Sequence, residues 1–253
     1  MAERGRPSPA RGVFETLLVR NGVPLELDRH LERLSASLQE LYGEALPPTA
    51  RTLIAASAEG IELGRLRLTA TPTPAGLELD VVTAPVEPSH VLPGWEHAVA
   101  LRQLAVPGGL GAHKWADREL LNEAESRFAG ALALVVDEDG TVLEGSRGNL
   151  FAVYGELVAT PAADGRILPG VTRRRVVELA RESGLDVREQ RITLDELPGA
   201  DEVFLSGAVR GIEPVRSLEG HASWGPGEKT GALSDRLLAL WTAEAAGQGA
   251  ATG

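Results

Sequence analysis

Lys114 is the side chain in this sequence with the clearest potential for chemistry. It lies in residues 111–118 (GAHKWADR), directly after a Pro-Gly-Gly break. The chain has 25 basic side chains, and only Lys114 and Lys229 among them are lysines. Arginine stays protonated, whereas a lysine amine can lose its proton and form a Schiff base with an aldehyde. We therefore interpret Lys114 as a candidate for Schiff-base chemistry, against the alternative of a solvated surface lysine.

A carboxylate and a helix start could complement such a lysine. Glu144 ends a predicted strand, where it could be an ordinary surface charge or could face a buried cation such as a pyridinium nitrogen. Residues 169–172 (PGVT) open a predicted helix. The N–H groups of a helix N-terminus can bind a phosphate, and the Thr172 hydroxyl would add a donor. The alternative for this motif is a plain threonine N-cap.

Two further positions could contribute to phosphate binding. Gly207, in residues 206–209 (SGAV), would let the backbone approach a ligand closely, or it could simply form a turn. Arg33 lies on a leucine-striped helix, where arginine usually faces solvent, but its side chain can hold a phosphate by two parallel hydrogen bonds. A lysine, a carboxylate for a ring nitrogen and a phosphate cradle together describe a pyridoxal phosphate site.

Composition limits the classes of protein to consider. The 253 residues can form one large domain or two ordinary ones, and 43% hydrophobic with 24% charged residues is typical of a soluble globular protein. With no cysteine we expect neither a disulfide nor a thiolate metal site, and we predict no metal ligands. The net charge of −11 argues against nucleic acid and anionic membranes as partners. No apolar run approaches membrane-helix length, and the N-terminus does not resemble a secretory signal. We therefore expect a cytoplasmic protein.

The first part of the chain reads as alternating strands and helices. Asn21-Gly22 predicts a hairpin turn after a strand, and Asp28 is the expected N-cap of the next helix. The spacing of apolar residues predicts strands at 13–20, 23–26, 65–70, 77–83 and 97–103, and helices at 29–41 and 49–59. We predict an N-terminal α+β domain over residues 1–104, with its first strand missing.

The glycine-rich residues 105–111 are the expected interdomain linker, and residues 112–253 the cofactor-binding domain. Gly184 is the expected C-terminal cap of the helix that follows the PGVT motif. The predicted helices of this domain are 117–129, 172–183 and 230–245, and its strands are 131–136, 142–144, 149–153, 157–160, 186–192 and 202–206.

The order of these motifs resembles the fold-type-IV pyridoxal phosphate enzymes, the family of branched-chain aminotransferase, D-amino acid transaminase and aminodeoxychorismate lyase. The segments that carry the resemblance are residues 12–16 (GVFET), 30–34 (HLERL), Lys114 with Asp117-Arg118, 144–151, 169–173 and 201–215. The resemblance implies a two-domain, α+β, D-amino acid aminotransferase-like fold with a barrel-like second domain. It also implies a small-molecule substrate, a cofactor bound between the domains, and a homodimer.

The resemblance further implies roles for particular residues. Lys114 would hold the cofactor aldehyde as a Schiff base and move the proton at the substrate carbon. Glu144 would keep the pyridine nitrogen protonated through a charge-assisted contact. The phosphate would be held by Arg33, the N–H groups of Val171 and Thr172, the Thr172 hydroxyl, and backbone at Gly207 and Ala208. The candidate substrate contacts are Phe14, Arg67, Arg147 and Arg210.

The sequence departs from the family in three ways. Gly12 comes almost at once, where members usually have a preceding strand. Thr71-Pro72 stands where many have Arg-Gly, which counts against D-amino acid transaminase activity unless Arg67 substitutes. Asp117 stands where Asn is common, and a carboxylate there could alter the pKa of Lys114 in either direction.

The loop before Pro214 favours one reaction. Arg210-Gly211 ahead of Pro214-Val215 looks more like aminodeoxychorismate lyase than like a branched-chain aminotransferase. The predicted reaction converts 4-amino-4-deoxychorismate to 4-aminobenzoate and pyruvate without consuming a keto acid. The alternatives are a class IV aminotransferase acting on a branched-chain or D-amino acid with a 2-keto acid, and a pyridoxal-phosphate-binding homologue without catalysis.

Overall fold

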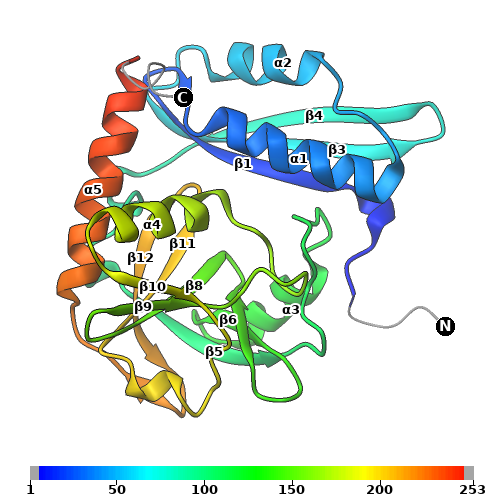
Figure 1. Ribbon diagram of the computed structural model, residues 1–253. Coiled ribbons are helices and arrows are strands. Elements are labelled where there is room, and N and C mark those ends of the chain that lie inside the picture. Colours follow the sequence, from blue (N-terminus) through cyan, green and yellow to red (C-terminus); the bar gives the residue numbers. More distant parts are fainter. Residues whose placement is uncertain (1–5, 248–253) are drawn as a thin grey trace. The chain divides into compact units, whose positions relative to one another are not determined.

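The computed structural model describes residues 6–247 and divides them into two compact units (Figure 1). The first unit contains residues 6–91, 113–118 and 239–247, and the second contains residues 92–112 and 119–238. Within the described range, every helix falls short of the length or the apolarity that a membrane span requires.

The first unit is a four-stranded antiparallel sheet with helices on one face. The strands, in the order β2-β1-β3-β4, are β1 (Val13–Arg20), β2 (Val23–Pro24), β3 (Leu63–Thr73) and β4 (Gly76–Pro85). Helices α1 (Leu27–Tyr42) and α2 (Thr49–Ala58) cover one face of this sheet (Figure 1). Leu17 of β1, Leu34 of α1 and Ile54 of α2 are buried in one core. Because side chains alternate along a strand, Phe14 of β1 and Arg67 of β3 lie on the opposite face.

The local signals in this unit have mixed outcomes. The hairpin at Asn21-Gly22 is confirmed, with φ of +51° and +77° as a type I′ turn requires. The prediction that Asp28 caps α1 is wrong, because the helix already begins at Leu27. Glu26 precedes the helix in a left-handed conformation, and its N–H donates to Glu244 at 2.7 Å, so a distant side chain fixes the helix entry.

The second unit is built around a closed barrel. Its nine-stranded sheet has the order β10-β9-β8-β11-β12-β5-β6-β7, with the ninth strand, β13, paired to β12. Strand β7 pairs back with β8, which closes six of the strands into a ring. Leu101, Leu134, Leu150 and Leu205 are buried inside this ring. The strands are β5 (Val99–Ala105), β6 (Leu132–Val136), β7 (Val142–Gly145), β8 (Gly148–Tyr154), β9 (Leu157–Thr160), β10 (Asp186–Glu189), β11 (Glu202–Gly207), β12 (Gly211–Leu218) and β13 (Ala222–Ser223).

Three helices accompany the barrel strands. They are α3 (Glu119–Arg127), α4 (Val171–Glu182), which packs on β10 and β11, and α5 (Glu228–Ala245), whose last turns from residue 239 are grouped with the first unit. The predicted α+β class with a barrel-like second part is confirmed. The predicted strand at 186–192 is shorter, ending at Glu189.

Two expectations about the second unit need correction. β5 pairs in parallel with β6 and β12, so the structure groups it with the barrel and not with residues 1–104 as we expected. Strand β12 was not predicted, because Gly211 and Pro214 are poor strand formers. Its pairing with β5 begins only at Val215, so the missing N–H of Pro214 removes no hydrogen bond on that side.

Candidate active site

The candidate residues fall into two groups, one in each unit, and Lys114 belongs to the first. The segment around Lys114 follows the start of β1: the N–H of Phe14 donates to the carbonyl of Lys114 at 2.8 Å, and Trp115 forms an isolated bridge with Val13. The Lys114 amine lies 4.9 Å from the centre of the Phe14 ring. Backbone pairing with β1 thus fixes Lys114 against Phe14.

Arg67 shares the same aromatic ring. Its guanidinium carbon lies 3.6 Å from the centre of the Phe14 ring. Burial lowers the pKa of Arg67, with smaller contributions from Arg118 and Arg65. The Arg67 Nε is buried and has no hydrogen-bond partner within residues 6–247. A buried donor without a partner is costly, so this guanidinium suits an anionic ligand.

On the other face of β1, a buried carboxylate joins two basic side chains. Glu15 accepts hydrogen bonds from Arg33 Nε at 2.8 Å and Nη2 at 2.6 Å, and it contacts His30 Nδ1 at 2.7 Å. Burial alone would raise the pKa of Glu15, but Arg33 and His30 outweigh it and lower the pKa to about 2. Burial lowers the pKa of His30, and Lys114 adds a small contribution in the same direction. A neutral His30 must donate from Nδ1, because the carboxylate can only accept.

Any phosphate contact of Arg33, the role predicted for it, must be made alongside its contact with Glu15. The two-point contact with Glu15 fixes the plane of the guanidinium and the direction of its third nitrogen, Nη1. Glu15 holds Arg33 in place, and His30 holds Glu15. Neither supporting role was predicted from the sequence. The signal that could have found them is an acidic residue within the otherwise apolar start of β1, together with the three-residue spacing of His30 and Arg33 on α1.

Asp117, which stands three residues after Lys114, is used in part for a structural contact. Its carboxylate accepts the N–H of Ser8 at 3.0 Å and pairs with Arg11 at 3.3 Å. Tyr42 of α1 donates to the carbonyl of Pro9 at 2.7 Å, which holds the same segment. These contacts fasten the chain ahead of β1 to the unit that carries Lys114.

In the second unit, Glu144 is a buried carboxylate with identified donors. The N–H of Leu168 lies 3.3 Å from both of its oxygens, and the Asn149 amide nitrogen lies 3.4 Å from one of them. Asn149 also donates to the carbonyl of Leu168 at 2.8 Å. Hydrogen bonds of this kind stabilise the ionised carboxylate, the form that a pyridinium nitrogen requires. Asn149 was missed by the sequence reasoning.

The start of α4 is shaped for a close approach. Gly170 precedes the helix in an extended conformation and offers no side chain to cap it. A Cβ at this position would lie 2.1 Å from the Asn149 side-chain oxygen, so any larger residue would force the Asn149 side chain to move. Val171 and Thr172, both buried, form the first turn. A helix start without a side-chain cap has N–H groups that can bind phosphate.

Gly207 ends β11, and the turn between β11 and β12 carries Ala208 and Arg210. Arg210 Nη1 lies 2.9 Å from Glu213 Oε1, an ion pair whose angles are not those of a hydrogen bond. Burial raises the pKa of Glu213, opposed by Arg210 and Arg147. Arg147 lies 3.7 Å from Glu125. Both predicted substrate arginines of this unit thus already have acidic neighbours.

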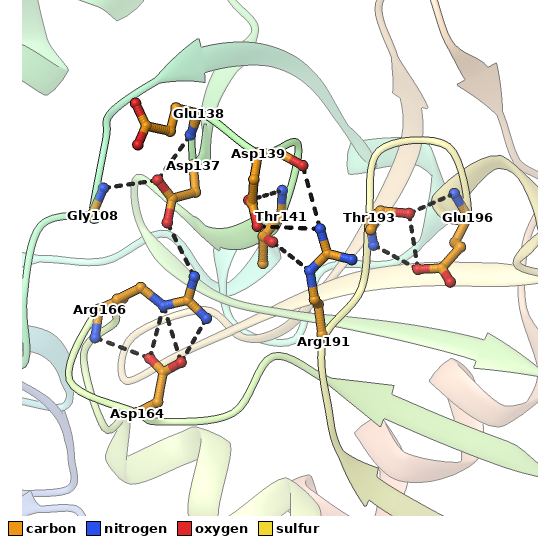
Figure 2. A network of polar contacts seen from close by, with 10 residues as sticks. All are labelled: Gly108, Asp137, Glu138, Asp139, Thr141, Asp164, Arg166, Arg191, Thr193 and Glu196. Carbon is orange, nitrogen blue, oxygen red and sulfur yellow. Dashed lines mark hydrogen bonds and ion pairs between the residues drawn. The ribbon is translucent and has the colours of Figure 1, made fainter.

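A polar network supports the loop that leads to Leu168 (Figure 2). Arg166 pairs with Asp164 at 2.6 Å and with Asp137 at 3.0 Å, and Asp137 also accepts the N–H of Gly108 at 2.9 Å. Hydrogen bonds to Asp164 and then Asp137 raise the pKa of Arg166. Nearby, Arg191 donates to Thr141 and Asp139 in a separate group of contacts (Figure 2). The contacts of Arg166 and Asp137 connect three loops. Arg166 lies two residues before Leu168, whose N–H donates to Glu144.

Taken separately, the residues of each unit fit parts of pyridoxal phosphate. Lys114 offers an amine on the same aromatic ring as Arg67, whose Nε has no partner within residues 6–247. Glu144 is a buried carboxylate held by donors, and the start of α4 has no side-chain cap. Each feature matches one part of the cofactor, namely its aldehyde, ring nitrogen and phosphate.

Comparison with known proteins agrees with this fit. Residues 12–218 match the model of the family described as Amino-transferase class IV. A "Putative branched-chain-amino-acid aminotransferase" of Methanocaldococcus jannaschii is 31% identical over 228 residues, which cover 83% of this chain and 79% of that protein. The branched-chain-amino-acid aminotransferase of Salmonella typhimurium is 42% identical over 102 residues, covering 40% of this chain and 33% of that protein.

Two solved structures extend the comparison. The 4-amino-4-deoxychorismate lyase of Pseudomonas aeruginosa has a TM-score of 0.77 and 28% identity, covering 94% of both chains. The pyridoxal-phosphate-bound form of "A hypothetical aminotransferase" from Mycobacterium tuberculosis has a TM-score of 0.81, covering 96% of both chains, and at 22% identity it shows the fold alone. The fold-type-IV architecture is therefore confirmed, and the chain belongs to the class IV aminotransferase family as a pyridoxal-phosphate-dependent enzyme.

Proposed function

We propose that this enzyme is a lyase that converts 4-amino-4-deoxychorismate to 4-aminobenzoate and pyruvate. The observation that carries the proposal is the Phe14 ring shared by the Lys114 amine and the Arg67 guanidinium, whose buried Nε has no hydrogen-bond partner within residues 6–247. The proposed substrate has an amine and two carboxylates. The Arg210-Gly211 loop and the 28% identity to the lyase of Pseudomonas aeruginosa add support.

The chain's own residues would divide the work as follows. When bound, pyridoxal phosphate supplies an aldehyde for amines and a ring that withdraws electrons. Lys114 would remove the proton from the amine-bearing carbon of the substrate. Glu144 would hold the proton on the ring nitrogen. The phosphate would be bound by the N–H groups of Val171 and Thr172, the Thr172 hydroxyl, Arg33, and backbone at Gly207 and Ala208.

Substrate contacts would come from four residues. Phe14 would provide an apolar wall, and Arg67 would bind one carboxylate. Arg147 or Arg210 would bind the other in exchange for its present acidic neighbour. The carbon skeleton of the substrate divides into 4-aminobenzoate and pyruvate with no added reactant, so the residues need only move protons and stabilise the leaving enolpyruvate until it becomes pyruvate.

A class IV aminotransferase acting on a branched-chain or D-amino acid is the second candidate. The relative from Methanocaldococcus jannaschii, which carries a branched-chain aminotransferase description, favours it. The same Lys114, Glu144 and phosphate ligands would serve this reaction, so only the substrate contacts separate the two. Thr71-Pro72, in place of Arg-Gly, argues against the D-amino acid form.

The deciding experiment is product formation without a keto acid. Purified protein with pyridoxal phosphate and 4-amino-4-deoxychorismate should release 4-aminobenzoate and pyruvate in equal amounts over many turnovers. Absence of both products, with transfer from a branched-chain amino acid to 2-oxoglutarate, would favour the aminotransferase. Absence of every reaction in protein that still binds the cofactor would favour the non-catalytic alternative.

We also propose that the enzyme is a cytoplasmic homodimer. The support is the resemblance to the family together with the absence of an apolar run of membrane-helix length in the sequence. Neither proposal affects the choice between the two reactions.

A further inference from the structure

Three polar residues form a row across neighbouring strands of the barrel. Glu144 of β7 is paired in register with Asn149 of β8, and Asn149 is paired with Ser206 of β11. Leu150 and Leu205, their chain neighbours, are in the barrel core. Because side chains alternate along a strand, Asn149 and Ser206 point to the opposite, outer face. The row begins at Glu144, the carboxylate proposed to contact the ring nitrogen of the cofactor.

The last member of the row, Ser206, has a buried hydroxyl. Ser206 is 2% exposed, and its hydroxyl is buried without a hydrogen-bond partner within residues 6–247. A buried hydroxyl can both donate and accept, and leaving it without a partner is costly. A bound ligand with an oxygen at this position would satisfy it.

The start of α4 lies beside this row. The Asn149 amide donates to the carbonyl of Leu168, and its oxygen lies 2.1 Å from where a Cβ on Gly170 would be. Residues 168 and 170 lead directly into α4, which packs on β11, the strand of Ser206. Asn149 therefore contacts the helix start, and Ser206 is its direct neighbour on the next strand. Two independent features, an uncapped helix start and an unpartnered buried hydroxyl, meet at the same place.

We propose that the Ser206 hydroxyl is a ligand of the cofactor's phosphate, alongside the first turn of α4. A phosphate oxygen can accept the hydroxyl proton, and such a charge-assisted hydrogen bond is stronger than a neutral one. Glu144 and Ser206 are two strands apart, about 10 Å between backbones, which suits a ligand with a ring nitrogen at one end and a phosphate at the other. The inference rests on the proposed phosphate site at α4 and not on which reaction the enzyme catalyses.

The test compares two ligands that differ only in the phosphate. Dissociation constants of the apoprotein for pyridoxal phosphate and for pyridoxal are measured for the wild type and Ser206→Ala. We expect Ser206→Ala to weaken pyridoxal phosphate binding about tenfold and to leave pyridoxal binding unchanged, because one charge-assisted hydrogen bond is lost. Ser183→Ala is the matched control: its hydroxyl bonds the carbonyl of Leu179 at the far end of α4, and neither constant should change.

A second measurement separates binding from folding. Because the Ser206 hydroxyl has no partner within the described residues, Ser206→Ala should not lower the unfolding temperature of the apoprotein. A lowered temperature, or equal weakening of both ligands, would mean that the hydroxyl has a structural role and would overturn the proposal. An unchanged affinity for pyridoxal phosphate would also overturn it.

Thr172→Ala tests the proposed phosphate site at the start of α4 separately from the role of Ser206. If Thr172→Ala weakens only pyridoxal phosphate and Ser206→Ala has no effect, the phosphate lies at α4 and the inference about Ser206 alone is wrong. If neither variant changes the preference for the phosphorylated ligand, the proposed phosphate site is wrong as well.

Discussion

At the scale of single residues, the two lysines of the chain have different surroundings. Lys229 pairs with Glu156 at 2.9 Å, and hydrogen bonding to that carboxylate raises its pKa. Lys114 lies against the Phe14 ring, and its charge acts on His30. Because the surroundings differ, a substitution of Lys229 can serve as the control for a substitution of Lys114.

Lys114→Ala should lower turnover by about a thousandfold or more, since it removes the group that handles the substrate proton. Borohydride reduction of the holoenzyme, followed by peptide mass spectrometry, should attach the cofactor to residue 114 in the wild type. Lys229→Ala should behave like the wild type in both measurements. Normal turnover of the Lys114 variant would remove Lys114 from the proposed mechanism.

Glu144→Gln should keep a coloured, cofactor-bound protein with a much slower reaction. An amide cannot hold a proton on the ring nitrogen, so the ring withdraws electrons poorly, and we expect a loss on the order of a hundredfold in kcat. The exposed Glu138→Gln is the control. Unchanged kcat would show that Glu144 is not the partner of the ring nitrogen.

Arg67→Gln should raise KM for the substrate about tenfold, because one charge-assisted contact to a carboxylate is lost. The effect on kcat should be smaller. Arg65→Gln is a matched control on the same face of β3, where the side chain is exposed. Equal KM values for the two variants would exclude Arg67 as a carboxylate ligand.

At the scale of elements, β1 and α1 are joined by the Glu15, His30 and Arg33 cluster, whose titration links stability to pH. The pKa of Glu15 is lowered from 4.5 to about 2 in the folded chain, so the unfolded chain binds a proton first as the pH falls. Glu15 thus contributes on the order of 3 kcal/mol above its unfolded pKa, and this contribution is lost between pH 4.5 and about 2. His30, with a pKa below 6.5 in the folded state, acts in the same direction from pH 6.5 downward.

The expected result is an unfolding free energy that decreases as the pH falls from 7, measured by denaturant unfolding at several pH values. Glu15→Gln should be less stable at pH 7 and should depend less on pH below 4.5. Glu32→Gln, an exposed carboxylate on the same helix, should keep the wild-type dependence. Identical slopes for the two variants would contradict the role assigned to Glu15.

At the scale of the whole molecule, the proposed homodimer has a direct measurement. Light scattering after size-exclusion chromatography should give twice the 26.7 kDa mass of one chain, independent of protein concentration over a wide range. The mass of a single chain at all concentrations would refute the dimer.

Some features of this protein could be derived from local sequence. Asn21-Gly22 predicted its hairpin because few residue pairs adopt two positive φ angles. The PGVT motif predicted the start of α4, since Gly170 stands one residue before the helix. Lys114 stood out because lysine is rare in this chain. Each of these signals depends on a few adjacent residues or on composition.

Other features depend on which distant segments meet. The contact of Glu15 with Arg33 follows from the packing of α1 on β1. The shared Phe14 ring of Lys114 and Arg67, and the pairing of Asn149 with Ser206, depend on how segments far apart in the chain align. β5 joined the barrel for the same reason, because a parallel partner lies far along the sequence. Spacing within one segment cannot encode such pairings, since they arise only when the core forms and sets the register of each strand.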